Sequence, residues 1–245
     1  MSSDHWFPGR WVGGTTLIVG PLLVLTGVVL RLPLLFAFPA EKLAALQAGG
    51  TYFPLELAAF DAHPHLMITA YGAFLAGNIA MWPAVLTLAS LIGRTHRTWA
   101  LWGGTLAMFG LFARTFHAGV DYFALQLTQV QTLDVATRAV ADAYPAISYG
   151  PFDLVGILGF AVLIGWVVLA IGTYRSRVLG ALRSAALGAM ALLMQGVLKG
   201  GTAASVLEAT ALCVALVPLG IRVLRGSPPP EPNGNLRADV APAAV

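Results

Sequence analysis

Six long apolar runs constrain the fold of this chain more than any other feature. They cover roughly residues 12–37, 66–92, 99–127, 150–174, 179–198 and 203–224. A helix needs about 20 apolar residues to cross the hydrocarbon core of a bilayer. Of the 245 residues, 58% are hydrophobic and 10% are charged, whereas soluble domains carry about 25% charged residues. The sequence therefore predicts an all-α, multi-pass bundle of six transmembrane helices in the cell membrane.

The arginines lie mainly at one end of these runs. They flank the spans or join them through short loops, at Arg10, Arg94, Arg97, Arg175, Arg177, Arg183, Arg222 and Arg225. The alternate loops, 38–65 and 128–149, are mainly acidic. Because short loops rich in arginine stay in the cytoplasm, both termini are predicted to be cytoplasmic. This topology also accounts for the net charge of +3, so no nucleic-acid partner is expected.

The sequence divides into three parts. Residues 1–11 form a cytoplasmic N-terminal segment, residues 12–225 form the transmembrane domain, and residues 226–245 form a cytoplasmic tail. The tail is rich in Pro, Gly and Ala and is predicted to be disordered. Two outer segments, 40–62 and 132–144, are predicted to form short helices that lie in the membrane interface.

The third run carries three ionisable residues on one helical face. Arg114, His117 and Asp121 fall within about 60° of one another at helical spacing. The opposite face carries phenylalanines, at Phe109, Phe112, Phe116 and Phe123. Because a charge that faces lipid costs about 3 kcal/mol or more, the polar face is predicted to look into the bundle.

Polar and aromatic residues from the other segments are predicted to meet this face in the outer half of the membrane. These candidates for a polar cavity are Arg31, Glu56, Asp61, Tyr71, Asn78, Phe152, Asp153 and Glu208. Two interpretations of the polar face are open. Arg114 and Asp121 serve either as interhelical counter-ions that fix the bundle, or as part of a cavity that binds a ligand.

The chemistry of these residues favours proton transfer over metal chemistry. Asp61, His63 and His65 lie close enough in sequence to suggest zinc or copper, but nothing in the chain completes such a site, so no metal and no cofactor is predicted. His117 and Asp121 are one helical turn apart and can form a hydrogen bond. A carboxyl group in such a pocket can protonate an alkene if water is excluded and aromatic rings stabilise the cation.

The chain resembles the small integral-membrane terpene cyclases of actinobacterial and fungal meroterpenoid pathways. The resemblance lies in its size, its multi-span layout and its acidic residues near the membrane boundary, and it is greatest to the enzymes that cyclise farnesylated indoles. Like them, the chain lacks the DDxxD and DxDD motifs of soluble terpene synthases. The resemblance implies a lipophilic prenylated substrate, protonation of its terminal alkene, ring closure and loss of a proton, without metal. Asp121 and Glu56 are the candidate acids, and His117 would orient Asp121.

A different class of function is also open. An outward-facing cavity lined by Arg, His and Asp is compatible with a small membrane transporter or sensor. The absence of a recognisable inverted repeat in the sequence argues against a secondary transporter. A third interpretation is a small scaffold or immunity protein in which the polar face has only a structural role.

Overall fold

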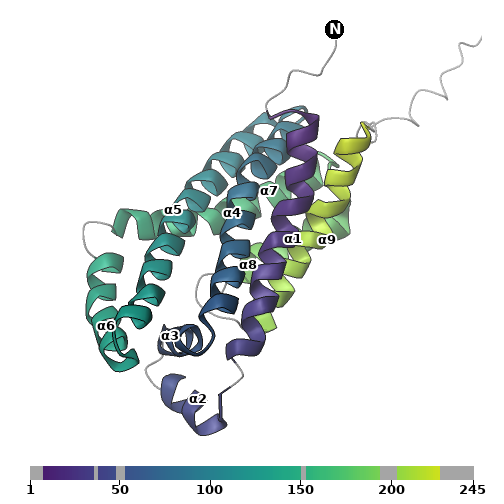
Figure 1. The fold of residues 1–245 in the computed structure, drawn as a ribbon. Coiled ribbons are helices and arrows are strands. Elements are labelled where there is room, and N and C mark those ends of the chain that lie inside the picture. The colour runs from purple at the N-terminus through teal and green to yellow at the C-terminus, as the bar shows by residue number, and fades with distance from the viewer. Residues whose placement is uncertain (1–7, 36–37, 48–52, 150–152, 194–202, 227–245) are drawn as a thin grey trace, which may run out of the picture.

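The computed structural model describes residues 8–35, 38–47, 53–149, 153–193 and 203–226. Within these ranges the chain forms nine helices and no strand, so the prediction of an all-α fold is confirmed. The helices are α1 (Arg10–Leu35), α2 (Ala40–Gln47), α3 (Phe53–Ala62), α4 (Pro64–Gly93), α5 (Arg97–Val130), α6 (Leu133–Tyr149), α7 (Asp153–Arg175), α8 (Ala181–Leu193) and α9 (Ala203–Arg225). The long helices run side by side along one axis (Figure 1).

Four helices of the described chain, α1, α4, α7 and α9, are long and apolar enough to cross a membrane. They indicate a membrane protein, in agreement with the sequence. The third predicted span is α5, which has 34 residues but is not among the four because its polar face lowers its mean hydropathy. The fifth predicted span corresponds to α8, whose 13 described residues are fewer than a bilayer crossing needs.

Small residues allow the long helices to pack closely. A side-chain carbon added at Gly77 of α4 would lie 2.6 Å from the backbone nitrogen of Val24 in α1. A carbon added at Gly220 of α9 would lie 2.7 Å from the carbonyl oxygen of Gly14 in α1. Helices in membranes associate largely through such close packing. The glycines therefore allow α4 and α9 to approach α1 closely.

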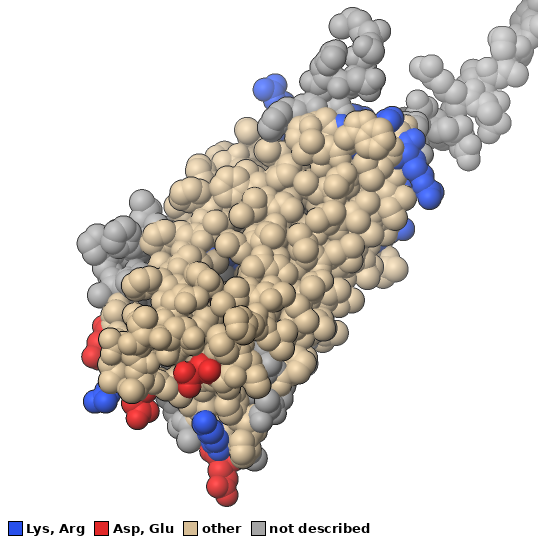
Figure 2. All heavy atoms as spheres, viewed as in Figure 1, with Lys and Arg blue, Asp and Glu red and all other residues tan. Residues whose placement is uncertain are grey.

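Charged side chains gather at the two ends of the bundle, and the surface between them is uncharged in the face that Figure 2 shows. The charged side chains at the end where α1 begins and α9 finishes are Lys and Arg, whereas Asp and Glu appear at the opposite end together with some Lys and Arg (Figures 1 and 2). Two contacts order the basic end. Arg222 Nη2 donates a hydrogen bond of 2.7 Å to the carbonyl of Val178, and the guanidinium of Arg175 lies 5.2 Å from the ring centre of Trp99.

The opposite end of the bundle is closed by α2, α3 and α6 (Figure 1). The sequence predicted short helices in segment 40–62, and α2 and α3 occupy it. However, α3 does not lie on the surface. Its residues 55–60 are all at most 3% exposed, and it contacts α1, α4, α5 and α6. The helix is therefore packed between the spans, and this position carries Glu56 into the interior.

Candidate functional site

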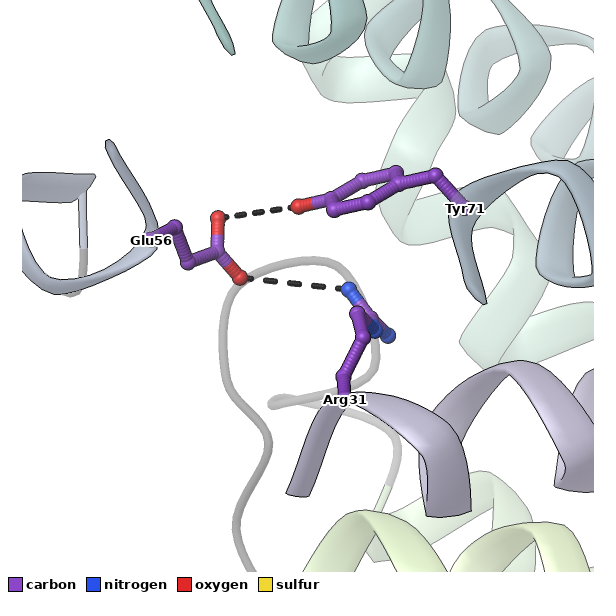
Figure 3. Close-up of polar contacts among 3 residues, drawn as sticks. All are labelled: Arg31, Glu56 and Tyr71. Carbon is purple, nitrogen blue, oxygen red and sulfur yellow. Dashed lines mark hydrogen bonds and ion pairs between the residues drawn. The ribbon is translucent and has the colours of Figure 1, made fainter. Parts of the chain in front are cut away.

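Three predicted cavity residues meet where α3 enters the bundle (Figure 3). The hydroxyl of Tyr71 donates a hydrogen bond of 3.0 Å to Glu56 Oε2. Arg31 Nη1 lies 3.8 Å from Glu56 Oε1 and forms an ion pair with it. Arg31, Glu56 and Tyr71 are 1%, 3% and 5% exposed, respectively. We call these three residues the Arg31–Glu56–Tyr71 cluster.

The cluster combines residues from three separate segments. Arg31 lies near the end of α1, Glu56 lies in the first turn of α3, and Tyr71 lies in α4. The guanidinium of Arg31 also lies 4.8 Å from the ring centre of Tyr71. Because each ion is buried, its partner offsets the loss of hydration, and removal of one partner leaves an uncompensated charge. The cluster therefore holds α3 against α1 and α4.

Phe74 connects the cluster to the middle of the bundle. Its ring centre lies 5.0 Å from the guanidinium of Arg31 and 5.6 Å from that of Arg114 in α5. Phe74 was not among the residues predicted from the sequence. A signal was present, because Phe74 lies between Tyr71 and Asn78 at helical spacing and shares their face of α4. Cation–π contacts of this kind stabilise buried guanidinium groups.

Beyond Phe74 lies a cavity formed by six helices. It is lined by Val24, Asn78, Met81, Leu111, Arg114, Trp166, Met190, Glu208, Ala209 and Leu212. About 30 Å³ of it admits the centre of a water molecule, and about 10–15 Å³ on this measure is enough for one water. Apolar side chains form most of the wall, and three predicted site residues, Asn78, Arg114 and Glu208, supply its polar groups. We call this space the central cavity.

Glu208 and Arg114 face the central cavity with unsatisfied polar atoms. Glu208 is 1% exposed and Arg114 is 2% exposed. Within the described part of the chain, neither carboxyl oxygen of Glu208 has a hydrogen-bond partner, nor do Nε and Nη2 of Arg114. The two charges act on each other, yet no ion pair within 4.0 Å joins them among the described residues. Asn78 differs, because its Nδ2 donates a hydrogen bond of 2.8 Å to the carbonyl of Phe74.

The two faces of α5 lie largely as the sequence predicted, except that Phe116 and His117 are both half-buried. Arg114 and Asp121 are buried, whereas Phe109, Phe112 and Phe123 are 53%, 59% and 69% exposed. Asp121 does not line the central cavity. It lies close enough to the Arg31–Glu56–Tyr71 cluster to act electrostatically on Tyr71. His117 is half-buried, and its ring centre is 5.6 Å from that of Phe116.

Of the remaining predicted cavity residues, one lies in neither the cluster nor the central cavity, and the side chains of the other two are not described. Asp61 is exposed at the end of α3 and does not line the central cavity. It lies near His63 and His65, which are exposed as well, and among the described residues no group of three or more His, Cys, Asp or Glu side chains is arranged to hold a metal. Asp153 begins α7, but its side chain lies outside the described part of the structure, as does the whole of Phe152.

Comparison with known proteins adds no relative. No family model matches the chain, and no curated protein or solved structure is similar to it. Function is therefore argued from the site itself. The fold and site define a helical membrane protein with a buried carboxyl group in a small cavity whose walls are mainly apolar.

Proposed function

We propose that the chain is an integral-membrane cyclase that protonates the prenyl chain of a lipophilic substrate, such as a farnesylated indole, and closes rings without a metal. The observation that carries this proposal is the position of Glu208. Its carboxyl group is buried in the central cavity and has no hydrogen-bond partner among the described residues. A carboxyl group in such a place is stabilised as the neutral acid, which is the form that can give a proton to an alkene.

The central cavity supplies groups for each part of the reaction. The carboxyl proton of Glu208 would form a C–H bond at the terminal alkene, and the electron pair of a second alkene would close the ring. The ring of Trp166, which lines the cavity, would stabilise the cation. Arg114 would stabilise the carboxylate of Glu208. Loss of a proton from the cation to this carboxylate would restore the acid, so the reaction is an isomerisation.

The other acid candidates have different surroundings. An ion pair with Arg114 would spoil either carboxyl group as an acid. Arg114 faces Glu208 in the central cavity, but no ion pair within 4.0 Å joins these two side chains among the described residues, so Glu208 can stay neutral. Asp121 therefore stays a second candidate acid, oriented by His117 as the sequence suggested. Glu56 is paired with Arg31 and accepts a hydrogen bond from Tyr71. We assign Glu56 a role in positioning α3.

The proposal includes a topology of six passes in the cell membrane with both termini in the cytoplasm. Its support is the gathering of Lys and Arg at one end of the bundle (Figure 2) and the length of α5, which has 34 residues. In this arrangement α5 makes the third pass, and the predicted run 179–198, which contains α8 and extends beyond the described residues, makes the fifth. The Arg31–Glu56–Tyr71 cluster then lies on the outer side of the central cavity.

The activity can be tested with the purified chain in phospholipid nanodiscs, supplied with a farnesylated indole in D₂O. The expected product has the composition of the substrate with one solvent-derived deuterium, because one proton is added and another is lost. Glu208→Gln should abolish turnover while the protein still purifies, since the amide keeps the shape and lacks the acidic proton. Asp142→Asn, an exposed change in α6, serves as the control and should stay active.

Each other outcome has a definite meaning. Activity in Glu208→Gln together with its loss in Asp121→Asn would move the acid to Asp121. The absence of any product from the unaltered chain would reject the cyclase. The buried charges that run from Glu56 through Arg114 to Glu208 would then favour the alternative, a small membrane transporter or sensor, because ionisable groups inside a membrane bundle commonly mark a proton or ion path.

A further inference from the structure

In the central cavity, the hydrogen-bond donors of Arg114 and the carboxyl group of Glu208 face the same small space but form no ion pair with each other. Nε and Nη2 lie on the same edge of the Arg114 guanidinium, and neither has a partner within the described chain. Both carboxyl oxygens of Glu208 also lack a hydrogen-bond partner among the described residues. Buried polar atoms are normally satisfied by protein, water or ligand. A third group between Arg114 and Glu208 would satisfy both side chains.

The chemistry of the two side chains limits what this group can be. It must accept hydrogen bonds from the edge of Arg114 and exchange a hydrogen bond with Glu208. A neutral carboxyl group donates through one oxygen and accepts through the other, so a group that satisfies both oxygens of Glu208 must accept and donate. An ammonium group only donates and a carbonyl or ether oxygen only accepts, whereas a hydroxyl group does both through a single oxygen. The free space suits one or two oxygens, because about 30 Å³ admits the centre of a water molecule and about 10–15 Å³ is enough for one water.

The rest of the wall indicates what carries the oxygen. Met81, Leu111, Met190 and Leu212 surround the polar pair, and such a wall favours an apolar body. We infer that the central cavity binds a single neutral hydroxyl oxygen between Arg114 and Glu208, carried by a lipophilic alcohol and replaced by water when no alcohol is present. This inference rests on the proposed function, and it means that the substrate or the product of the cyclase carries a hydroxyl group. Binding does not depend on turnover, so the two proposals can fail separately.

Binding can be measured with the purified chain in nanodiscs of zwitterionic phospholipid. The melting temperature is followed during titration with farnesol and with farnesyl methyl ether, which has the same chain and an oxygen that cannot donate. Farnesol should give a saturable rise, and the ether should bind up to about tenfold more weakly, the effect of one lost hydrogen bond to the accepting oxygen of Glu208. Farnesylamine, which is cationic and only donates, should also bind more weakly than farnesol.

The variant that tests the site removes both charges together. Arg114→Met with Glu208→Leu keeps the cavity filled by apolar groups of similar size and leaves no lone buried charge, so the protein should still fold. It should lose the preference for farnesol over the ether, while Asp142→Asn keeps it. The inference is overturned if the unaltered chain binds the two compounds equally, or if the double variant keeps the preference. No response to farnesol would show that the cavity holds water alone, which also overturns it.

Discussion

Glu56 offers the sharpest test at the scale of single residues. Glu56→Gln keeps an acceptor for Tyr71 but leaves the buried charge of Arg31 without its ion-pair partner. Loss of one member of a buried pair costs about 3–5 kcal/mol. We therefore expect a large drop in the melting temperature of the purified protein. Glu41→Gln, an exposed change in α2, is the matched control. Equal melting temperatures for the two variants would contradict the structural role of the cluster.

For single residues, the sequence predicted burial more successfully than it predicted contacts between residues. Helical periodicity was enough to place Arg114 and Asp121 inside and Phe109 outside, because that pattern depends on one helix alone. The partner of Arg31 depends on how α3 folds back against α1 and α4, which periodicity does not encode. Phe74 was missed for the same reason. Its contact with two arginines exists only once α1 and α5 flank α4.

The packing of α5 against α7 gives a test at the scale of elements. A side-chain carbon added at Gly110 would collide with the backbone of Val162 in α7. Backbone cannot move aside as a flexible side chain can, so Gly110→Ala should cost about 1–3 kcal/mol. Gly119 lies on the same helix, and a carbon added there meets no atom within 4 Å. Gly119→Ala should therefore leave the melting temperature unchanged or slightly higher.

The comparison within α5 controls for the effect of alanine itself. A fall of similar size in both variants would mean that the close approach to α7 is not what Gly110 provides. A fall in Gly110→Ala alone would support the packing seen in the structure.

For the helices, the sequence predicted the bounds of the long spans well, but it did not predict how a short helix such as α3 packs. The predicted runs 66–92 and 203–224 agree closely with α4 (Pro64–Gly93) and α9 (Ala203–Arg225). Length and hydropathy decide such spans, and both are properties of one segment. The surroundings of α3 could not be predicted in this way. Its ten residues are apolar enough for an interface or an interior, and only packing against the five helices α1, α2, α4, α5 and α6 selects the interior.

At the scale of the whole molecule, the distribution of charge predicts how the bundle sits in the membrane. The turn between α4 and α5 lies at the basic end, and α6 lies at the end where acidic residues appear (Figures 1 and 2). Six passes with cytoplasmic termini place that turn in the cytoplasm and α6 outside. We expect Thr95→Cys and Ala141→Cys, both at exposed positions, to lie on opposite sides of the membrane, which labelling with a membrane-impermeant maleimide can show.

This experiment starts from a Cys213→Ser background, because Cys213 is the chain's single cysteine. Cysteine at 141 should react in intact cells, whereas cysteine at 95 should react only after the membrane is opened. The two sites lie at opposite ends of α5 and its flanking turns, so the result depends directly on whether α5 crosses the bilayer. Labelling of both sites from one side would show that α5 does not cross. In that case the polar face of α5 would not lie inside a membrane bundle, and the energetic argument that directs Arg114 and Asp121 inward would lose its basis.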